Sequence, residues 1–432
     1  MMSRMNEIYL KELNTYSKEY LLTLMNEESF ERLIEYEVIK REEDNFKFHF
    51  VGLIIVDNYL IKCYPKYIPD ENNIAEDFNQ IMQVIKKYRN FHEDYIWRSD
   101  NLDEITFNKL SILLFFIEDY YENGIYTNFR QIHQVNGNGE INWDKTVNNI
   151  DPIIKNNRPY YGELYTKYNL NDLSDYFRLL HEYIITECSK QLEDVGLIDL
   201  FDLTPAELSD KSLDDFGEEY YILNKIENEI NMEFNSHKQK LLKAMHTFIS
   251  QKNSFTNENV LTIYGTTAYH EIWEEMCCEI FSNKFNKIKH VIEKPKWILN
   301  NGKTHYHKKT FEPDIVTFKG DTLFILDAKY YNLIFNEDLL ANQPGLGDIT
   351  KQYLYQLALE DYGEGKFDNV KNALLFPKYC GEIENLGQIE IEILSRLPVD
   401  NIQVVMLPAG KINRLYLNNQ KLDINELKLN KN

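Results

Sequence analysis

The sequence has few cysteines, and their spacing excludes the two common structural uses of this residue. The five cysteines are odd in number and widely spread, and Cys277 and Cys278 are adjacent, without the two intervening residues of a zinc-binding pair. Neither a disulfide framework nor a cysteine-based zinc site is therefore expected. We expect reduced thiols, most of them buried.

Long apolar runs are also missing. The longest run, residues 112–117, is far shorter than the roughly 20 residues that cross a bilayer. The first residues carry no apolar core of a signal peptide. These absences predict a cytoplasmic protein that does not contact a membrane.

Positive charge is scarce as well, with 47 Lys and Arg against 69 Asp and Glu and a formal net charge of -22. So acidic a surface does not bind membranes or nucleic acids over its whole extent, and any nucleic-acid contact must be local. A phosphate-binding loop is lacking too. The Gly302-Lys303 pair has Trp297 where that loop needs a glycine, so the sequence predicts no nucleotide site in this chain.

The chain does contain enough apolar material for several cores. Its residues are 43% hydrophobic and include 24 Phe and 30 Tyr, a composition that excludes a largely disordered protein. Its length of 432 residues is more than one hydrophobic core normally holds. A polar break lies between Asp151-Pro152 and Arg158-Pro159, long helical patterns cover residues 173–192 and 218–249, and strands alternate with helices after residue 265. The sequence predicts an α+β N-terminal domain (1–157), a helical connector (158–250) and an α/β domain with a mixed sheet flanked by helices (251–432).

Two β-hairpins are expected. In residues 46–67 two β-rich runs surround the turn dipeptide Asp57-Asn58, and Pro65 ends the second run. In residues 314–327 two strands are joined by Gly320-Asp321, which suits a two-residue turn. Opposed residues of this second hairpin have numbers that sum to 641. Asp314 then faces Asp327, with Cβ atoms about 5 Å apart on one face of the sheet.

Facing carboxylates in an apolar hairpin need an explanation, because like charges directly opposite one another destabilise a sheet. A shared proton would relieve the repulsion, but Mg²⁺, which takes oxygen ligands and keeps several waters, fits the pair better. Lys329 lies two residues after Asp327 and therefore on the same face, where its ammonium can assist a metal-bound water and stabilise charge at phosphorus. Alternatively, these are surface residues at a strand end, and Glu312 pairs with Lys329.

The flanking helices offer further candidates. A helix expected to begin at Asp348, as its N-cap, places Gln352 and Gln356 on an apolar stripe, where their amides need partners such as Lys329 or a water. In the helix expected before the hairpin, Glu274 and Glu279 both border the apolar face. Periodicity alone does not decide which of the two glutamates lies near the metal.

One local segment carries the positive charge that DNA contact requires. Residues 284–309 contain eight lysines, three histidines and a single acid, a balance of +7, with Phe285, Trp297 and Tyr306 interspersed. His305 and His307 suit either a metal or phosphate contacts. A solvated basic loop is the alternative for the whole segment, but its position beside the carboxylates favours DNA.

Pro313, Asp314, Asp327, Ala328 and Lys329 together resemble the motif of the PD-(D/E)xK nuclease superfamily. Four further stretches extend the resemblance over most of the chain: FVGLIIVDNYLIKCYPKYI (50–68), GEINWDKTV (139–147), IWEEM (272–276) and LDAKYY followed by KQYLYQLAL. With these stretches the chain resembles the LlaJI-type restriction endonuclease family, which is related to McrC.

The resemblance implies a fold, an activity and partners. The C-terminal domain would be a PD-(D/E)xK nuclease domain that cuts double-stranded DNA in a phage-defence restriction system. Asp314, Asp327 and Glu274 would hold Mg²⁺, Lys329 would assist the attacking water, and Gln356 would support the site. The N-terminal half would bind a separate McrB-like AAA+ GTPase. The alternatives are a non-catalytic adaptor that binds DNA and stimulates the GTPase, and a stand-alone DNA-repair nuclease.

Overall fold

The computed structural model describes residues 5–70, 74–91, 109–250, 261–363, 367, 369–394, 397 and 399–429. The chain divides into two compact units. Unit 1 consists of Met1–Met2 and Lys109–Val260, and unit 2 consists of Ser3–Asn108 and Leu261–Asn432. Unit 1 is thus an insertion in the sequence of unit 2. The structure differs here from the three consecutive domains that the sequence predicts.

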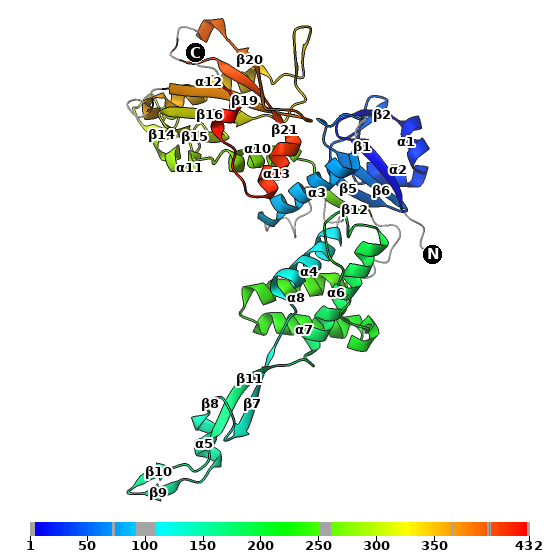
Figure 1. Cartoon of the computed structure of the whole chain (residues 1–432), viewed down its shortest axis with the longest axis vertical. Coiled ribbons are helices and arrows are strands. Elements are labelled where there is room, and N and C mark those ends of the chain that lie inside the picture. Colours follow the sequence, from blue (N-terminus) through cyan, green and yellow to red (C-terminus); the bar gives the residue numbers. More distant parts are fainter. Residues whose placement is uncertain are drawn as a thin grey trace. The chain divides into compact units, whose positions relative to one another are not determined.

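The N-terminal part of unit 2 is built from two small sheets and three helices, drawn mostly in blue in Figure 1. The four-stranded sheet has the order β1-β6-β5-β12, and the three-stranded sheet has the order β2-β4-β3. The elements are β1 (Asn6–Lys11), β2 (Thr15–Ser17), α1 (Lys18–Leu24), α2 (Glu27–Glu35), β3 (Ile39–Glu42), β4 (Asn45–Phe48), β5 (Val51–Val56), β6 (Tyr59–Tyr64), α3 (Ile74–Phe91) and β12 (Thr262–Thr266). Apolar side chains of all these elements except α3 form one continuous core.

The predicted hairpin of residues 46–67 is confirmed as β5 and β6. Val56 pairs with Tyr59 across the turn, Asp57 has the positive φ of 51° that such a tight turn requires, and Pro65 follows the last residue of β6. Strand β1 pairs with β6 in parallel, so the C-terminal ends of both strands lie at the same end of the sheet. The residues at that end supply several side chains to the site described below.

Strand β12 lies beside β5 because two glycines face each other. Gly265 is paired with Gly52, and Gly52 has a φ of 142°. A Cβ on Gly52 would lie 2.3 Å from the carbonyl oxygen of Tyr264, and a Cβ on Gly265 would lie 2.2 Å from that of Val51. Only residues without a side chain allow the two backbones to approach this closely.

The C-terminal part of unit 2 holds a five-stranded mixed sheet with the order β15-β16-β19-β21-β20. The three inner strands are parallel, and the two edge strands are antiparallel to their neighbours. Helix α12 lies on one side of this sheet, and α10 and α13 lie on the other (Figure 1). The elements are α10 (Tyr269–Ile280), α11 (Phe285–Ile288), β15 (Ile315–Lys319), β16 (Thr322–Ala328), α12 (Leu346–Gly363), β19 (Asn369–Lys378), β20 (Glu384–Ile389), β21 (Ile402–Pro408) and α13 (Ala409–Leu417).

The register predicted for the second hairpin is confirmed. The pairs Ile315–Leu326 and Lys319–Thr322 each sum to 641, and Gly320 takes a φ of 61° in the two-residue turn. From Leu323 onward every side chain of β16 is buried, because β16 lies inside the sheet and is covered on both faces. The predicted α/β domain with a mixed sheet and flanking helices is therefore present.

Short elements extend from this domain: the 3-10 helices at Lys289–Val291, Glu392–Leu394 and Ile424–Leu427, the hairpin of β13 (Lys296–Ile298) and β14 (Thr304–Tyr306), and the hairpin of β17 (Ile334–Phe335) and β18 (Leu340–Ala341). One predicted boundary is wrong. Helix α12 begins at Leu346, so Asp348 lies in its first turn and is not the N-cap.

Unit 1 combines a helical part with a β-rich extension (Figure 1). The helical part contains α4 (Lys109–Asn123), α6 (Tyr176–Asp194), the 3-10 helix Leu213–Phe216, α7 (Glu219–Met232) and α8 (Ser236–Ser250). The extension contains β7 (Phe129–Val135), β8 (Glu140–Ile141), α5 (Trp143–Asn149), β9 (Ile153–Lys155), β10 (Arg158–Tyr160) and β11 (Tyr165–Asn171). The predicted boundary after residue 157 separates β9 from β10, which form one hairpin.

Candidate active site

Asp314 is held in place through its backbone and its side chain. It directly precedes β15, and the confirmed register places it opposite Asp327. Its carbonyl oxygen accepts hydrogen bonds from Asn283 Nδ2 at 2.7 Å and from Cys278 Sγ at 3.2 Å. Its Oδ2 accepts one from the backbone N–H of Ala328 at 3.0 Å. The Asp314 carboxylate is therefore fixed at the C-terminal end of β16.

Three carboxylates share the space at this strand end. Burial raises the pKa of Asp314 to about 8, and the negative charges of Asp327 and Glu274 add to the effect, whereas Lys329 opposes it. Burial also raises the pKa of Glu274, against the attraction of Lys329 and together with the repulsion from Asp327. Ionising Asp314 and Glu274 is thus costly here, and a cation placed among the three carboxylates would relieve the cost.

Lys329 supplies one positive charge to this group. Its Nζ lies 2.5 Å from Asp327 Oδ2 and 3.6 Å from Asp348 Oδ1. Burial disfavours the ammonium, but the charge and hydrogen bond of Asp327, with Asp314 and Asp348, outweigh burial and raise the pKa of Lys329. Lys329 is therefore an ammonium at neutral pH. The alternative pairing with Glu312 is wrong, because Glu312 Oε1 lies 2.7 Å from Lys289 Nζ.

The structure distinguishes the two glutamates that periodicity could not. Helix α10 buries its predicted apolar face, and Glu274 emerges beside Lys329 and Asp327. Glu279 lies one and a half turns further along, where its Oε1 is 3.8 Å from Lys87 Nζ and 3.7 Å from Lys421 Nζ. Glu274 is the glutamate at the site.

The two glutamines of α12 are buried and bonded to β19. Asn372 Nδ2 donates to Gln356 Oε1 at 3.0 Å, and Gln352 Nε2 donates to Asn372 Oδ1 at 2.7 Å. Gln352 is fully buried, and its amide bonds to Asn372 and not to the expected Lys329. Since Asn372 occupies the Gln356 oxygen, these contacts explain how α12 is fastened to the sheet. The role of Gln356 at the site stays a prediction.

The donor set fits a hard divalent cation in part. Among the residues that the structure describes, no group of three or more His, Cys, Asp or Glu side chains is arranged to hold a metal ion. Two facing carboxylates, however, suit Mg²⁺, which commonly takes one or two protein carboxylates and completes its shell with water and substrate phosphate. Asp314 and Asp327 are the two candidates. Glu274 is near them but does not complete a three-ligand group.

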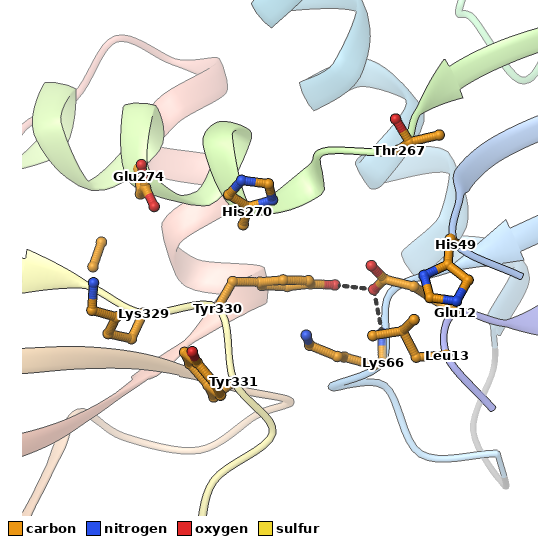
Figure 2. Close-up of a pocket in the computed structure, with 11 residues that line it drawn as sticks. Glu12, Leu13, His49, Lys66, Thr267, His270, Glu274, Lys329, Tyr330 and Tyr331 are labelled. Carbon is orange, nitrogen blue, oxygen red and sulfur yellow. Dashed lines mark hydrogen bonds between the residues drawn. The ribbon is translucent and has the colours of Figure 1, made fainter. Parts of the chain in front are cut away.

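A cavity of about 350 Å³ opens beside Lys329 and Glu274. Figure 2 shows that further side chains come from the end of the N-terminal sheet, including Glu12 and Lys66, and from the start of α10, including His270, beside Tyr330 and Tyr331. Sequence reasoning missed Glu12, Lys66 and His270. They are distant in sequence from the aspartates, and no local sequence pattern indicates that the N-terminal and C-terminal parts of unit 2 meet at this cavity.

Comparisons with known proteins identify the family of the chain. A family model described as LlaJI restriction endonuclease matches residues 50–410. The chain belongs to the LlaJI restriction endonuclease family. The match spans Asp314, Asp327, Lys329 and Glu274, as well as Lys66. The LlaJI family resemblance drawn from the sequence motifs is therefore confirmed.

One relative of this LlaJI family member is the type II restriction enzyme BsuMI component YdjA of Bacillus subtilis (strain 168). It is 32% identical over 400 residues, which cover 88% of this chain and 83% of the relative. Two solved structures from Thermococcus gammatolerans also match at 12% identity. McrC bound to McrB AAA+ hexamers has a TM-score of 0.39 and covers 96% of this chain and 99% of that chain. An McrBC complex has a TM-score of 0.26, with 62% and 84% covered. Both likenesses are too weak to carry an argument.

Among the described residues, no helix has the combination of length and apolar character needed to cross a membrane.

Proposed function

We propose that this chain is the magnesium-dependent DNA endonuclease subunit of a restriction system, and that its C-terminal α/β domain is of the PD-(D/E)xK type. The observation that carries the proposal is the arrangement at the end of β16. Asp314 faces Asp327 there, and the ammonium of Lys329 lies 2.5 Å from Asp327. Membership of a restriction endonuclease family supports the same reading.

The residues have distinct roles in the proposed reaction. Asp314 and Asp327 would hold Mg²⁺, which when bound activates a water and neutralises charge on the phosphate. The Lys329 ammonium stabilises the negative charge that develops on the phosphate oxygens. Its raised pKa keeps it protonated, so it orients the attacking water by donating a hydrogen bond rather than by removing a proton. Glu274, which lies beside Lys329 and Asp327, would accept the proton of the attacking water.

The basic segment supports binding of double-stranded DNA. Its hairpin pairs Trp297 with His305 and Lys296 with Tyr306, so each face of the ribbon carries one aromatic and one basic residue. Trp297 is 66% exposed and Tyr306 is 65% exposed. A ribbon that exposes aromatic and basic side chains on both faces is suited to contacting phosphates and bases.

The extension of unit 1 supports binding of a protein partner. Ile153 and Ile154 are successive residues of β9, so they point to opposite faces of its hairpin, and they are 65% and 64% exposed. Trp143 and Val147 of α5 and Tyr160 of β10 are also more than half exposed. Exposed apolar residues at this density mark an interaction surface. We assign it to an McrB-like AAA+ GTPase, the partner that the LlaJI and McrC resemblance implies.

Plasmid cleavage tests the proposal. The full chain is incubated with supercoiled plasmid and Mg²⁺, with and without GTP and an McrB-like GTPase. We expect cleavage by the complex, loss of cleavage with EDTA, and at least about 100-fold less cleavage with Asp327→Asn or Lys329→Met. Asp321→Asn is the matched control, because Asp321 is an exposed aspartate in the turn of the same hairpin. Unchanged cleavage by Asp327→Asn would reject the site.

A second function is favoured by one observation. Since the described residues contain no three-ligand metal group, a non-catalytic adaptor that binds DNA and stimulates the GTPase also fits. In that case GTP hydrolysis rises when this chain is added, while plasmid remains intact in Mg²⁺. Cleavage at full rate without any nucleotide or GTPase would instead indicate a nuclease that acts alone.

A further inference from the structure

The cavity beside Lys329 has walls from the N-terminal and the C-terminal parts of unit 2 (Figure 2). One wall comes from the residues that follow the C-terminal ends of the parallel strands β1 and β6, and it carries Glu12 and Lys66. The other wall comes from the residues that follow β16 and from the first turns of α10, and it carries Lys329, Tyr331 and His270. The cavity therefore connects the proposed catalytic lysine with a lysine of the N-terminal sheet.

Glu12, the acid whose charge acts on Lys66, already accepts hydrogen bonds from other groups. Glu12 Oε2 accepts a hydrogen bond from the Tyr330 hydroxyl at 2.5 Å and another from the backbone N–H of Lys66 at 3.2 Å. The ammonium of Lys66 lies instead over aromatic rings, 4.2 Å from the centroid of Tyr330 and 6.0 Å from that of Tyr331. Among the described residues it makes no ion pair or hydrogen bond.

The neighbouring lysines of the same sheet behave differently. Lys11 Nζ lies 3.2 Å from Asp70 Oδ1, and Lys62 Nζ lies 2.7 Å from Glu7 Oε2. Burial lowers the pKa of Lys66, although Glu12 opposes this effect, so its unpaired charge carries a cost in the folded chain. A half-buried ammonium that faces a cavity and has aromatic rings but no ion pair beside it can take an anion as its charged partner.

We propose that Lys66 binds a backbone phosphate of the DNA next to the phosphate that is cut, so that the N-terminal sheet forms part of the substrate-binding surface of the nuclease site. The inference rests on the proposed function, because the cavity is shared with Lys329 and Glu274. Lysine binds phosphate as a point charge and needs no fixed geometry. His270, exposed on the opposite wall, is placed to contact the same anion.

The test measures DNA binding separately from cleavage. The full chain carrying Asp327→Asn is titrated with a labelled DNA duplex at several salt concentrations, alone and with Lys66→Met. Loss of one phosphate contact should weaken binding at every salt concentration and reduce the slope of log K against log[salt] by about 0.9. Lys40→Met is the matched control, because Lys40 is an exposed lysine of β3 outside the cavity, and its slope should stay unchanged.

Each outcome is decisive. An equal slope for Lys66→Met and its parent overturns the inference while leaving the nuclease proposal intact. Absence of any duplex binding by the parent, both without and with the GTPase and GTP, overturns the proposed function itself. If Lys66→Met lowers the melting temperature of the chain, Lys66→Arg and Lys66→Gln replace it. Arginine should restore the parental slope and glutamine should not, whereas equal slopes for these two variants would again overturn the inference.

Discussion

Tyr330 donates a hydrogen bond of 2.5 Å to Glu12, and this contact joins the residue after Lys329 to the end of β1. Both side chains are buried, and burial raises the pKa of Glu12, so the carboxyl group depends on its hydrogen bonds. The backbone just after β16 is thereby anchored to the N-terminal sheet.

Tyr330→Phe should therefore affect both stability and catalysis. Removing the hydroxyl leaves Glu12 Oε2 with only the Lys66 N–H, which should cost about 1–3 kcal/mol of unfolding free energy in a denaturant titration. A small displacement of Lys329 should lower the cleavage rate at saturating DNA by about 10-fold or more. Tyr331→Phe is the control, since its hydroxyl makes only a 3.5 Å contact with Asp348. Equal effects of the two variants would contradict the prediction.

The two glutamates of α10 should respond differently to the same substitution. Glu274→Gln removes a carboxylate from the site, and we expect cleavage to fall by about 100-fold or more. Glu279→Gln removes a carboxylate that pairs with Lys87 and Lys421, and it should leave the cleavage rate within about 2-fold. Rates from single-turnover plasmid assays measure both. Comparable losses of cleavage rate in the two variants would contradict the placement of Glu274, and not Glu279, at the site.

The facing glycines should tolerate no side chain. Gly265→Ala places a Cβ 2.2 Å from the Val51 carbonyl oxygen, so β12 must separate from β5 or the sheet must distort. We expect a loss of at least about 2–3 kcal/mol in unfolding free energy. The glycine of the exposed turn, Gly302, has open space around it but a positive φ, so Gly302→Asn serves as the tolerated comparison. A stable Gly265→Ala chain would contradict the close approach of the two strands.

His181 should make unit 1 sensitive to mild acid. Burial lowers the pKa of His181 to about 3, with a smaller contribution from His237, and its Nδ1 accepts a hydrogen bond from the Tyr126 N–H at 3.0 Å. The His181 imidazole takes up a proton near pH 6.5 in the unfolded chain, whereas in the folded chain it stays neutral down to about pH 3. Stability is therefore fully present above pH 7 and is lost as the pH falls, by about 2 kcal/mol at pH 5.

Amide hydrogen exchange in α6, compared at pH 8 and pH 5 after correction for the intrinsic rate, measures this loss. His181→Asn keeps an acceptor for the Tyr126 N–H but cannot be protonated, so it should flatten the pH dependence. An undiminished pH dependence in that variant would assign the acid sensitivity to other groups.

What the sequence predicted correctly depends on local geometry. The turn at Gly320-Asp321 sets the register of the hairpin, and the period of two then fixes which side chains face Asp314. The apolar face of α10 followed from helical spacing in the same way. These features need only the residues within one hairpin or one helix.

What the sequence missed depends on contacts between distant segments. Nothing in the five residues of β12 indicates that they pair with β5, and nothing near Lys66 indicates that it shares a cavity with Lys329. The polar break around Asp151-Pro152 suggested a domain boundary, but Pro152 precedes β9, Asn156 and Asn157 form the turn, and Pro159 lies within β10. Turn residues mark a reversal of the chain and do not tell a hairpin from a linker.

The insertion of unit 1 between β6 and β12 has a consequence for synthesis on the ribosome. Strand β5 emerges early, but the strand that covers its edge is translated only after all of unit 1. Throughout that interval β5 presents unpaired backbone groups from Val51 to Val56, a segment of almost purely apolar residues. Rapid folding of unit 1 shortens this exposure, and slow translation of residues 109–260 lengthens the time in which the nascent chain is open to strand-to-strand aggregation.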